Sequence, residues 1–138
     1  MLVVGPDVVH WVATRTNEFG NFGAAVGIGW ARNGELVAGA VFNEWNGANI
    51  NGHIAATGRH AFTRDFLWAM GHYPFVQLGV KRVTALVAEG NTAARRFNEH
   101  LGYQLETRLA GAHPTGDLLI YVMWPENYKW LERKKHAQ

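Results

Sequence analysis

Two side chains in the first half of the sequence have the chemistry of a general base. His53 lies within the segment ANINGHIAA, residues 48–56, and Glu44 lies near the end of the segment before it. Because imidazole titrates near neutrality, His53 is the favoured candidate to take a proton from a reacting group, and Glu44 is the second. Each also has a structural explanation, as a hydrogen-bonded histidine or as an exposed charge at a strand end. A chain of water molecules could replace both.

The segment that carries His53 has the alternating pattern of a β-strand. Ile50, Gly52 and Ile54 share one face, and the other face carries Asn49, Asn51 and His53. Because an apolar face meets the core, the polar face is expected to meet solvent or a cleft. The Asn-Gly pairs at 33–34 and 46–47 predict tight turns that join this strand to antiparallel strands over 24–30 and 35–45.

Two helices are expected on either side of these strands in the sequence. Asp7 can cap a helix over residues 8–17, and Thr63 can cap a second helix. Pro74 should bend or end that second helix near Tyr73, since proline cannot donate a backbone hydrogen bond. The segment RVTALVA, residues 82–88, is apolar on both faces and predicts a central strand covered on both sides.

The stretch NTAARRFNEHLGY, residues 91–103, predicts a short helix that begins at Asn91 and stops at Gly102. Segments 103–109 and 117–124 predict a last pair of strands. The order of these elements indicates an α+β fold, with a mixed antiparallel and parallel sheet of about six strands and helices on both faces. A length of 138 residues suits a single domain over 1–138.

Composition excludes several classes of site. The sequence has no cysteine, so disulfides, thiolate metal ligands and a cysteine nucleophile are absent. Its seven histidines form no HExxH motif, so no metal site is predicted. A formal net charge of +2 does not favour nucleic-acid binding. No apolar run approaches ~18 residues and the first residues do not have the pattern of a signal peptide, so a cytoplasmic protein without a membrane partner is expected.

The stretch 91–103 and the order of elements resemble the GNAT superfamily of acyl-coenzyme A-dependent N-acetyltransferases. The shared features are Asn91, Ala94 and Phe97 followed by Leu-Gly-Tyr at 101–103, and Gly-Asp at 116–117 leading into LIYVM. The run YPFVQLGVKRVTALV, residues 73–87, is similar to ribosomal-protein and phage-encoded members of that superfamily. The resemblance covers roughly residues 8–124.

The resemblance implies a site where the fourth and fifth strands of the sheet, here 48–57 and 82–88, splay apart. Acetyl-CoA would enter this gap, with its pantetheine arm along the free edge of the fourth strand at Ala55, Ala56 and Thr57. The residues that would line the arm from the next helix are Asn91, Ala94 and Phe97. Family members often pair, so a homodimer is compatible with the resemblance.

The resemblance also implies that the pyrophosphate sits on backbone amides that open the helix after the fourth strand, where a helix N-terminus favours anions. The loop of this chain departs from the family pattern of an Arg or Gln followed by small residues. Arg59 fills the first slot, but Phe62 and Arg64 stand where small residues are expected, with Thr63 between them. Arg59 and Arg64 could compensate by pairing with phosphate oxygens, or they could be plain surface charges.

The activity implied is transfer of an acetyl group from acetyl-CoA to a primary amine by direct attack on the thioester. The acceptor is open between a protein or peptide amine and a small amine. The slot in which many family members carry a tyrosine is matched to Phe97, which cannot protonate the leaving sulfur. Two alternatives follow: a catalytically silent GNAT-like module that binds acyl-CoA or a protein partner, and a small α+β protein that only echoes the pattern.

Overall fold

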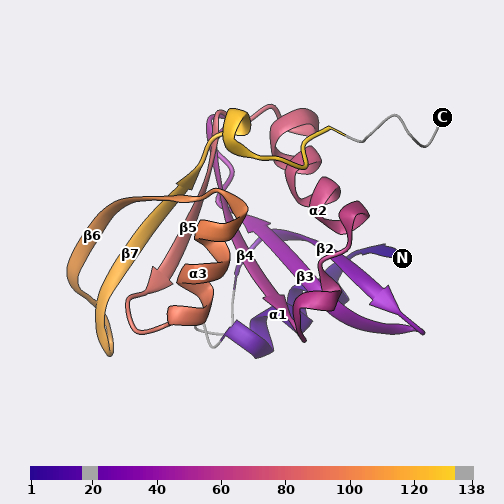
Figure 1. Ribbon diagram of the computed structural model, residues 1–138, viewed down its shortest axis with the longest axis horizontal. Helices are drawn as coiled ribbons and strands as arrows, with labels where there is room; N and C mark the ends of the chain where they lie inside the picture. Colours follow the sequence, from indigo (N-terminus) through magenta and orange to yellow (C-terminus); the bar gives the residue numbers. More distant parts are fainter. Residues whose placement is uncertain (17–21, 133–138) are drawn as a thin grey trace.

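A seven-stranded sheet in the order β1-β2-β3-β4-β5-β7-β6 forms the frame of the protein (Figure 1). The computed structural model describes residues 1–16 and 22–132. Within them β4 and β5 are the parallel pair, and all other neighbours are antiparallel. The strands are β1 Leu2–Val4, β2 Ala25–Arg32, β3 Glu35–Asn43, β4 Asn49–Ala56, β5 Arg82–Ala88, β6 Gln104–His113 and β7 Gly116–Met123.

The predicted fold class is confirmed, because the sheet is mixed and helices pack on both of its faces. The α-helices are α1 Pro6–Thr16, α2 Arg64–Gly71 and α3 Thr92–Leu101. The strand that the sequence did not predict is β1, whose three residues are too few to show an alternating pattern. None of the helices in the described ranges is long and apolar enough to cross a bilayer.

The first hairpin forms as predicted and the second does not. Asn33 and Gly34 both have positive φ, 55° and 82°, as a two-residue turn between β2 and β3 requires. Between β3 and β4, however, residues 44–48 form a longer loop. The Asn46 side chain accepts hydrogen bonds from the N–H groups of Ala48 and Asn49, which stabilises this wider turn in place of a tight one.

Helix α1 covers one face of β1 to β4. Its fully buried Val8 and Val12 pack with Phe22 and Val41 in a small core of their own. The helix begins at Pro6, whose fixed φ suits the first helical position, so Asp7 lies in the first turn and the prediction that it is the cap is wrong. The predicted last residue of this helix, 17, lies outside the described residues.

The larger core lies on the opposite face, beneath α2 and α3. The Thr63 hydroxyl accepts from the N–H of Phe66 and caps α2 as predicted. The predicted interruption near Pro74 is a change of winding: α2 ends at Gly71, and His72–Gln77 continue as a π-helical turn closed by the Leu78 N–H on the Tyr73 carbonyl.

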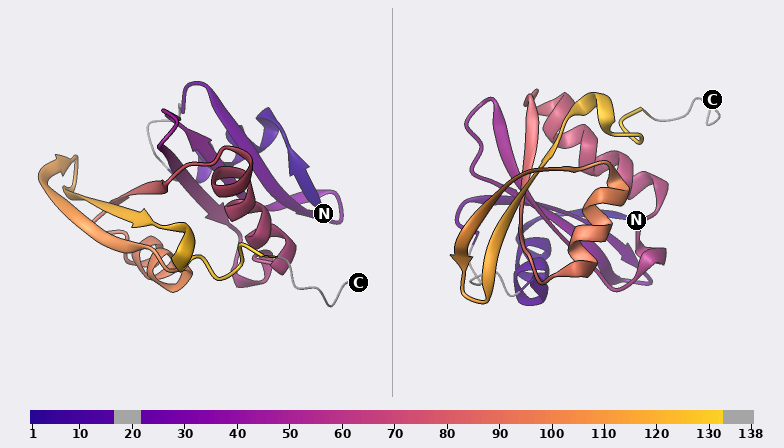
Figure 2. Two further views of the ribbon diagram at one scale, coloured as in Figure 1. Left: turned by 90° about the horizontal axis from the view of Figure 1, so that it is seen from above. Right: turned by 60° about the vertical axis from the view of Figure 1, so that its left-hand side comes forward.

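Strand β5 has the predicted bounds but only one fully covered face. Val83, Ala85 and Val87 are buried in the larger core, whereas the residues on its other face, Thr84, Leu86 and Ala88, are only half-buried. The expectation of cover on both sides is therefore wrong, because α1 packs over β1 to β4 and stops short of β5. Beyond β5, the β6–β7 hairpin extends away from the rest of the sheet (Figure 2).

The end of α2 packs against the C-terminal part of the chain at Gly71. A Cβ atom added at Gly71 would lie 2.5 Å from the Tyr128 ring, and this ring is fixed by its hydroxyl, which donates to the Leu67 carbonyl oxygen. Gly71→Ala is therefore expected to lower the free energy of unfolding by about 1–3 kcal/mol through overpacking. Urea denaturation measures the change, and Gly90→Ala, where an added Cβ meets nothing within 4 Å, should have little effect.

Candidate active site

Strands β4 and β5 separate after three residue pairs. Their pairing joins 49–51 to 82–84, and no pair joins the remainder of the two strands. A cleft of about 670 Å³ lies where they diverge. The described residues that line it are Arg15, Thr16, Gly52, His53, Ile54, Ala55, Ala56, Gly58, Phe62, Ala85, Leu86, Val87, Ala88, Asn91, Ala93, Ala94, Phe97 and Asn98. The predicted splay between the fourth and fifth strands is confirmed.

The cleft receives side chains from both faces of the sheet. On the α1 face, His53 and Ala55 of β4 lie beside the end of α1. On the opposite face, Ile54 and Ala56 of β4 face the larger core, together with Phe62 and residues of α3. Because consecutive strand residues alternate between faces, a ligand in this cleft would meet different side chains on the two faces of the sheet.

The backbone edge of β4 that faces the cleft follows from its pairing with β3. The Thr57 N–H donates to the Val37 carbonyl oxygen, and the Ala48 carbonyl oxygen accepts from Lys81 on the β5 side. In an antiparallel pair the direction of these groups alternates, so His53 and Ala55 bond toward β3. The N–H and C=O groups of Ile54 and Ala56 therefore point toward the cleft, beyond the last residue paired with β5.

This alternation changes the predicted cofactor edge. Ala56 has the expected orientation, but the backbone of Ala55 is directed toward β3 and the Thr57 N–H is already bonded there. Ile54 takes the place of Ala55 and Thr57 on the free edge. Sequence reasoning fixed which face each side chain occupies, whereas the edge depends on the register with β3, which the sequence does not reveal.

His53 is held in one tautomer at the cleft. The Asn43 Nδ2 donates to the Phe22 carbonyl oxygen (2.9 Å), so the Asn43 Oδ1 accepts from Nε2 of His53 (3.0 Å). The imidazole therefore carries its hydrogen on Nε2 and its lone pair on Nδ1. Its ring also packs on Phe22, with ring centroids 4.4 Å apart. A neutral His53 can accept a proton at Nδ1.

Burial lowers the pKa of His53 to about 4 because the imidazolium would lose its contact with water. In the unfolded chain the group titrates near 6.5, so at pH 5 the unfolded state binds a proton that the folded state does not. The contribution of neutral His53 to the free energy of unfolding is therefore fully present above about pH 6.5 and is lost as the pH falls from there toward 4.

The free energy of unfolding of the wild type is expected to fall by about 2 kcal/mol between pH 7 and pH 5 on account of His53. His53→Gln should lose much less over the same interval, because glutamine does not titrate. Urea denaturation at the two pH values measures the difference. His10→Gln is the control, since His10 is exposed and this variant should keep the wild-type dependence. An equal loss in His53→Gln and wild type would contradict a buried neutral His53.

Glu44 does not reach the cleft. It lies in the loop after β3 with φ of 58°, its side chain is exposed, and it is not among the residues that line the cleft. The structure therefore brings His53 to the cleft and leaves the second candidate base outside it. None of the described lining residues is a carboxylate, and Arg15 is the one cation among them, with its guanidinium 3.9 Å from the Trp11 ring centroid.

Several backbone amides of the loop before α2 are hydrogen-bonded within the loop itself. A 3-10 turn, Arg59–Ala61, precedes the helix, and the N–H groups of residues 61, 62 and 63 donate to carbonyl oxygens within the loop. Arg59 and Arg64 are exposed, and neither lines the cleft. The predicted phosphate site therefore has arginine side chains nearby, while three of the amides in the loop already have partners.

Helix α3 forms the opposite wall with Asn91, Ala94 and Phe97. The Asn91 Oδ1 accepts from the Ala94 N–H (3.1 Å), which confirms its predicted role as the helix cap. Phe97 packs against Phe62, with ring centroids 4.4 Å apart, so two departures from the family pattern form one contact. Sequence reasoning missed Asn98, a buried residue that also lines the cleft. Its signal was a polar side chain four residues after Ala94, on the apolar stripe of the helix.

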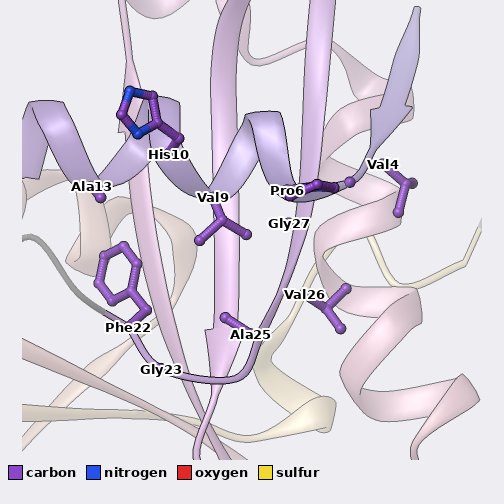
Figure 3. Close-up of a pocket in the computed structure, with 11 residues that line it drawn as sticks. Val4, Pro6, Val9, His10, Ala13, Phe22, Gly23, Ala25, Val26 and Gly27 are labelled. Carbon is purple, nitrogen blue, oxygen red and sulfur yellow. The ribbon is translucent and has the colours of Figure 1, made fainter.

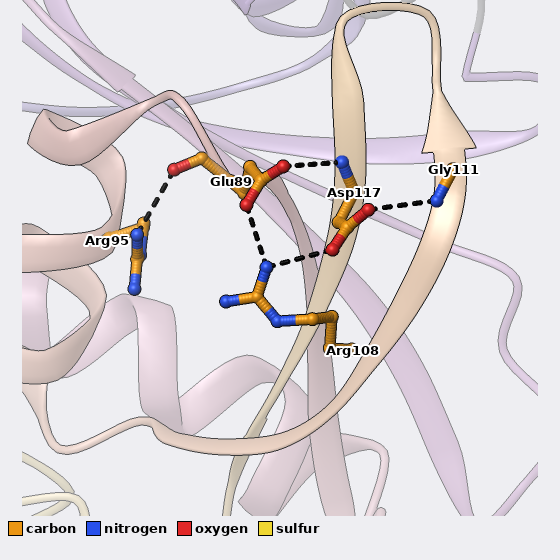
Figure 4. Close-up of polar contacts among 5 residues, drawn as sticks. All are labelled: Glu89, Arg95, Arg108, Gly111 and Asp117. Carbon is orange, nitrogen blue, oxygen red and sulfur yellow. Dashed lines mark hydrogen bonds and ion pairs between the residues drawn. The ribbon is translucent and has the colours of Figure 1, made fainter.

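A charged cluster fixes the loop that leads from β5 into α3 (Figure 4). Arg108 on β6 donates to Glu89 (2.7 Å) and to Asp117 (2.9 Å), and the Glu89 carboxylate also accepts from the Asp117 N–H. The backbone bond from Asp117, and next the bond from Arg108, lower the pKa of Glu89. The cluster ties the β5 end of the cleft to the β6–β7 hairpin, away from β4.

A second hollow of about 470 Å³ lies between α1 and the start of β2. Val9 and Ala13 face Phe22 and Ala25 across it (Figure 3). None of the predicted site residues lines this hollow, and its lining is mostly apolar. Within the described residues no group of histidine and carboxylate side chains is placed to hold a metal ion.

Comparison with solved structures identifies the same architecture in acetyltransferases. The ribosomal-protein-S18-alanine N-acetyltransferase from Escherichia coli superposes with a TM-score of 0.67 at 16% identity, covering 99% of this chain and 98% of that one. A mutant spermidine N-acetyltransferase from Vibrio cholerae gives 0.72 at 16%, covering 96% and 98%. A GNAT-family acetyltransferase from Bacillus anthracis gives 0.61 at 17%, covering 74% of this chain and 66% of that one.

No protein-family model matches the sequence, and no curated protein matches it. Identities of 13–17% bear on the fold alone. The β4–β5 splay, the helix that begins at Asn91 and the agreement over almost the whole chain lead to one conclusion. This chain has the fold of the GNAT acetyltransferases.

Proposed function

We propose that this chain is an N-acetyltransferase that moves an acetyl group from acetyl-CoA to a primary amine. The observation that carries the proposal is the unpaired edge of β4 beside the cleft, in a chain with the GNAT fold. The N–H and C=O groups of Ile54 and Ala56 fit a slender arm that itself carries amide groups. Ala94 and Phe97 of α3 would form the opposite wall.

The acceptor amine would approach from the α1 face, where His53 lies. In the proposed step the amine nitrogen forms a bond to the thioester carbonyl carbon, the C–S bond breaks, and the amine proton passes to Nδ1 of His53. A backbone N–H at Ile54 or Ala56 is the donor for the oxygen that gains negative charge. His53 is neutral at pH 7 because burial lowers its pKa to about 4, so the lone pair on Nδ1 is free to take the proton, although as a weaker base than an ordinary imidazole.

The leaving sulfur departs as a thiolate in this proposal. Neither Tyr103 nor Tyr121 lines the cleft, and the Tyr121 hydroxyl donates to Glu99 (2.8 Å). Burial raises the pKa of the Tyr103 hydroxyl, which makes it a poorer acid. A thiol with a pKa of about 8.5 leaves acceptably without a proton donor.

Charge around the cleft favours an acceptor with a single amine. Arg15 is the one charged side chain among the described lining residues, and no carboxylate lies there to hold a polycation. An amine next to neutral or acidic groups, as at the terminus of a peptide, fits this charge better than a polyamine does.

Isothermal titration with acetyl-CoA, followed by release of free thiol over a panel of amines, tests the proposal. Saturable binding with thiol release for a peptide amine supports it, whereas absence of binding contradicts it. A second candidate is an acyl-CoA-binding module without catalysis, which the internally bonded amides of the loop before α2 favour. Binding without thiol release for any acceptor, including spermidine, would support that module.

A further inference from the structure

Asn98 is the one polar or charged residue that is buried among the described residues. It lies on α3 and is 7% exposed, yet it lines the cleft between β4 and β5. It follows Ala94 by four residues and Asn91 by seven, so the three share the face of the helix that meets the cleft. A leucine or valine would be expected at such a position if packing were the only requirement.

The side-chain amide of Asn98 has no hydrogen-bond partner among the residues that the structure describes. Its backbone carbonyl oxygen accepts from the Gly102 and Tyr103 N–H groups at the end of α3, which fixes this part of the helix. The side chain takes no part in that arrangement. The amide is not among the fully buried polar atoms that lack a partner, so it keeps contact with the cleft and is free to bond to a ligand there.

Both walls of the cleft carry groups that can bond to an amide. An asparagine amide presents donors and an acceptor side by side, and its natural complement is another amide group. On the facing wall, Ile54 and Ala56 present backbone N–H and C=O groups that also complement an amide-bearing chain. We infer that Asn98 binds an amide group of the ligand in this cleft. Under the proposed function, on which this inference rests, that group belongs to the amide-bearing arm of acetyl-CoA.

Asn98→Val is the variant that tests the inference, since valine and asparagine have similar helix propensities. The affinity for acetyl-CoA is expected to fall about 10-fold, the effect of one lost hydrogen-bonding group. S-acetylpantetheine, which keeps the arm and lacks the nucleotide, should lose affinity by the same factor. The melting temperature without ligand should stay close to that of the wild type, because the Asn98 side chain bonds to none of the residues that the structure describes.

Arg96→Val is the matched control, because Arg96 is exposed on the same helix and does not line the cleft. It should bind both ligands as the wild type does. Unchanged binding by Asn98→Val, or a lowered melting temperature with binding reduced no more than in Arg96→Val, would overturn the inference and make Asn98 a structural residue. If the wild type itself binds neither ligand, the proposed function fails. If the wild type and Asn98→Val bind equally well, the proposed function stands and only the inference about Asn98 fails.

Discussion

Replacing His53 by glutamine is expected to lower kcat/KM for acetyl transfer by about 10²–10⁴-fold, the usual contribution of a positioned general base. Glutamine keeps a polar side chain that can bond to Asn43, so the cleft should retain its shape while losing the lone pair on Nδ1. The affinity for acetyl-CoA should change little, since His53 lies on the α1 face of the cleft. Steady-state kinetics with a peptide amine, together with titration of acetyl-CoA, measures both quantities.

His10→Gln provides the control for this prediction. His10 is exposed on α1, beside the second hollow and not the cleft, so its variant should keep wild-type kinetics. A loss of less than about 10-fold in His53→Gln would mean that a water molecule or the acceptor itself removes the proton. Loss of acetyl-CoA binding in His53→Gln would instead assign His53 to the donor side of the cleft.

Filling the cleft with a larger side chain from α3 is expected to weaken the binding of acetyl-CoA. Ala94 is half-buried and faces the gap opposite β4, so Ala94→Phe would place a ring where the arm of acetyl-CoA is proposed to lie. We expect the affinity for acetyl-CoA to fall on the order of 100-fold, equivalent to about 2.7 kcal/mol. Isothermal titration measures the affinity, and circular dichroism checks that the fold is kept.

Arg96→Phe is the matched control for the filled cleft, because it adds the same ring to an exposed position of the same helix. Its affinity should equal that of the wild type. Wild-type affinity in Ala94→Phe would show that the donor binds elsewhere on the molecule, and the apolar hollow beside α1 would become the next place to test.

Local signals in the sequence predicted much of the frame. Residues 82–88 form a strand with the expected bounds, and Asn91 caps the next helix, because both depend on residues close together in the chain. The turn at Asn33-Gly34 also depends only on neighbouring residues and forms as predicted. The second turn failed because the Asn46 side chain bonds to two backbone amides, an alternative that an Asn-Gly pair does not reveal.

The candidate site depended more on contacts between distant residues. Phe62 and Phe97 each depart from the family pattern, but their packing depends on how the loop before α2 is placed against α3. The pKa of His53 depends on burial beneath Phe22 and α1, which no local pattern gives. Asn98 could have been found from the sequence, as a polar residue on an apolar helical stripe.

Residue-resolved amide exchange, measured by NMR with and without acetyl-CoA, tests the central claim most directly. The N–H groups of Ile54 and Ala56 should exchange fast in the free protein, while those of His53 and Ala55, bonded toward β3, exchange slowly. Saturating acetyl-CoA should then slow Ile54 and Ala56 and leave His53 and Ala55 as they were. Slow exchange at Ile54 and Ala56 in the free protein, or no response to acetyl-CoA, would contradict a β4 edge that is open to the donor.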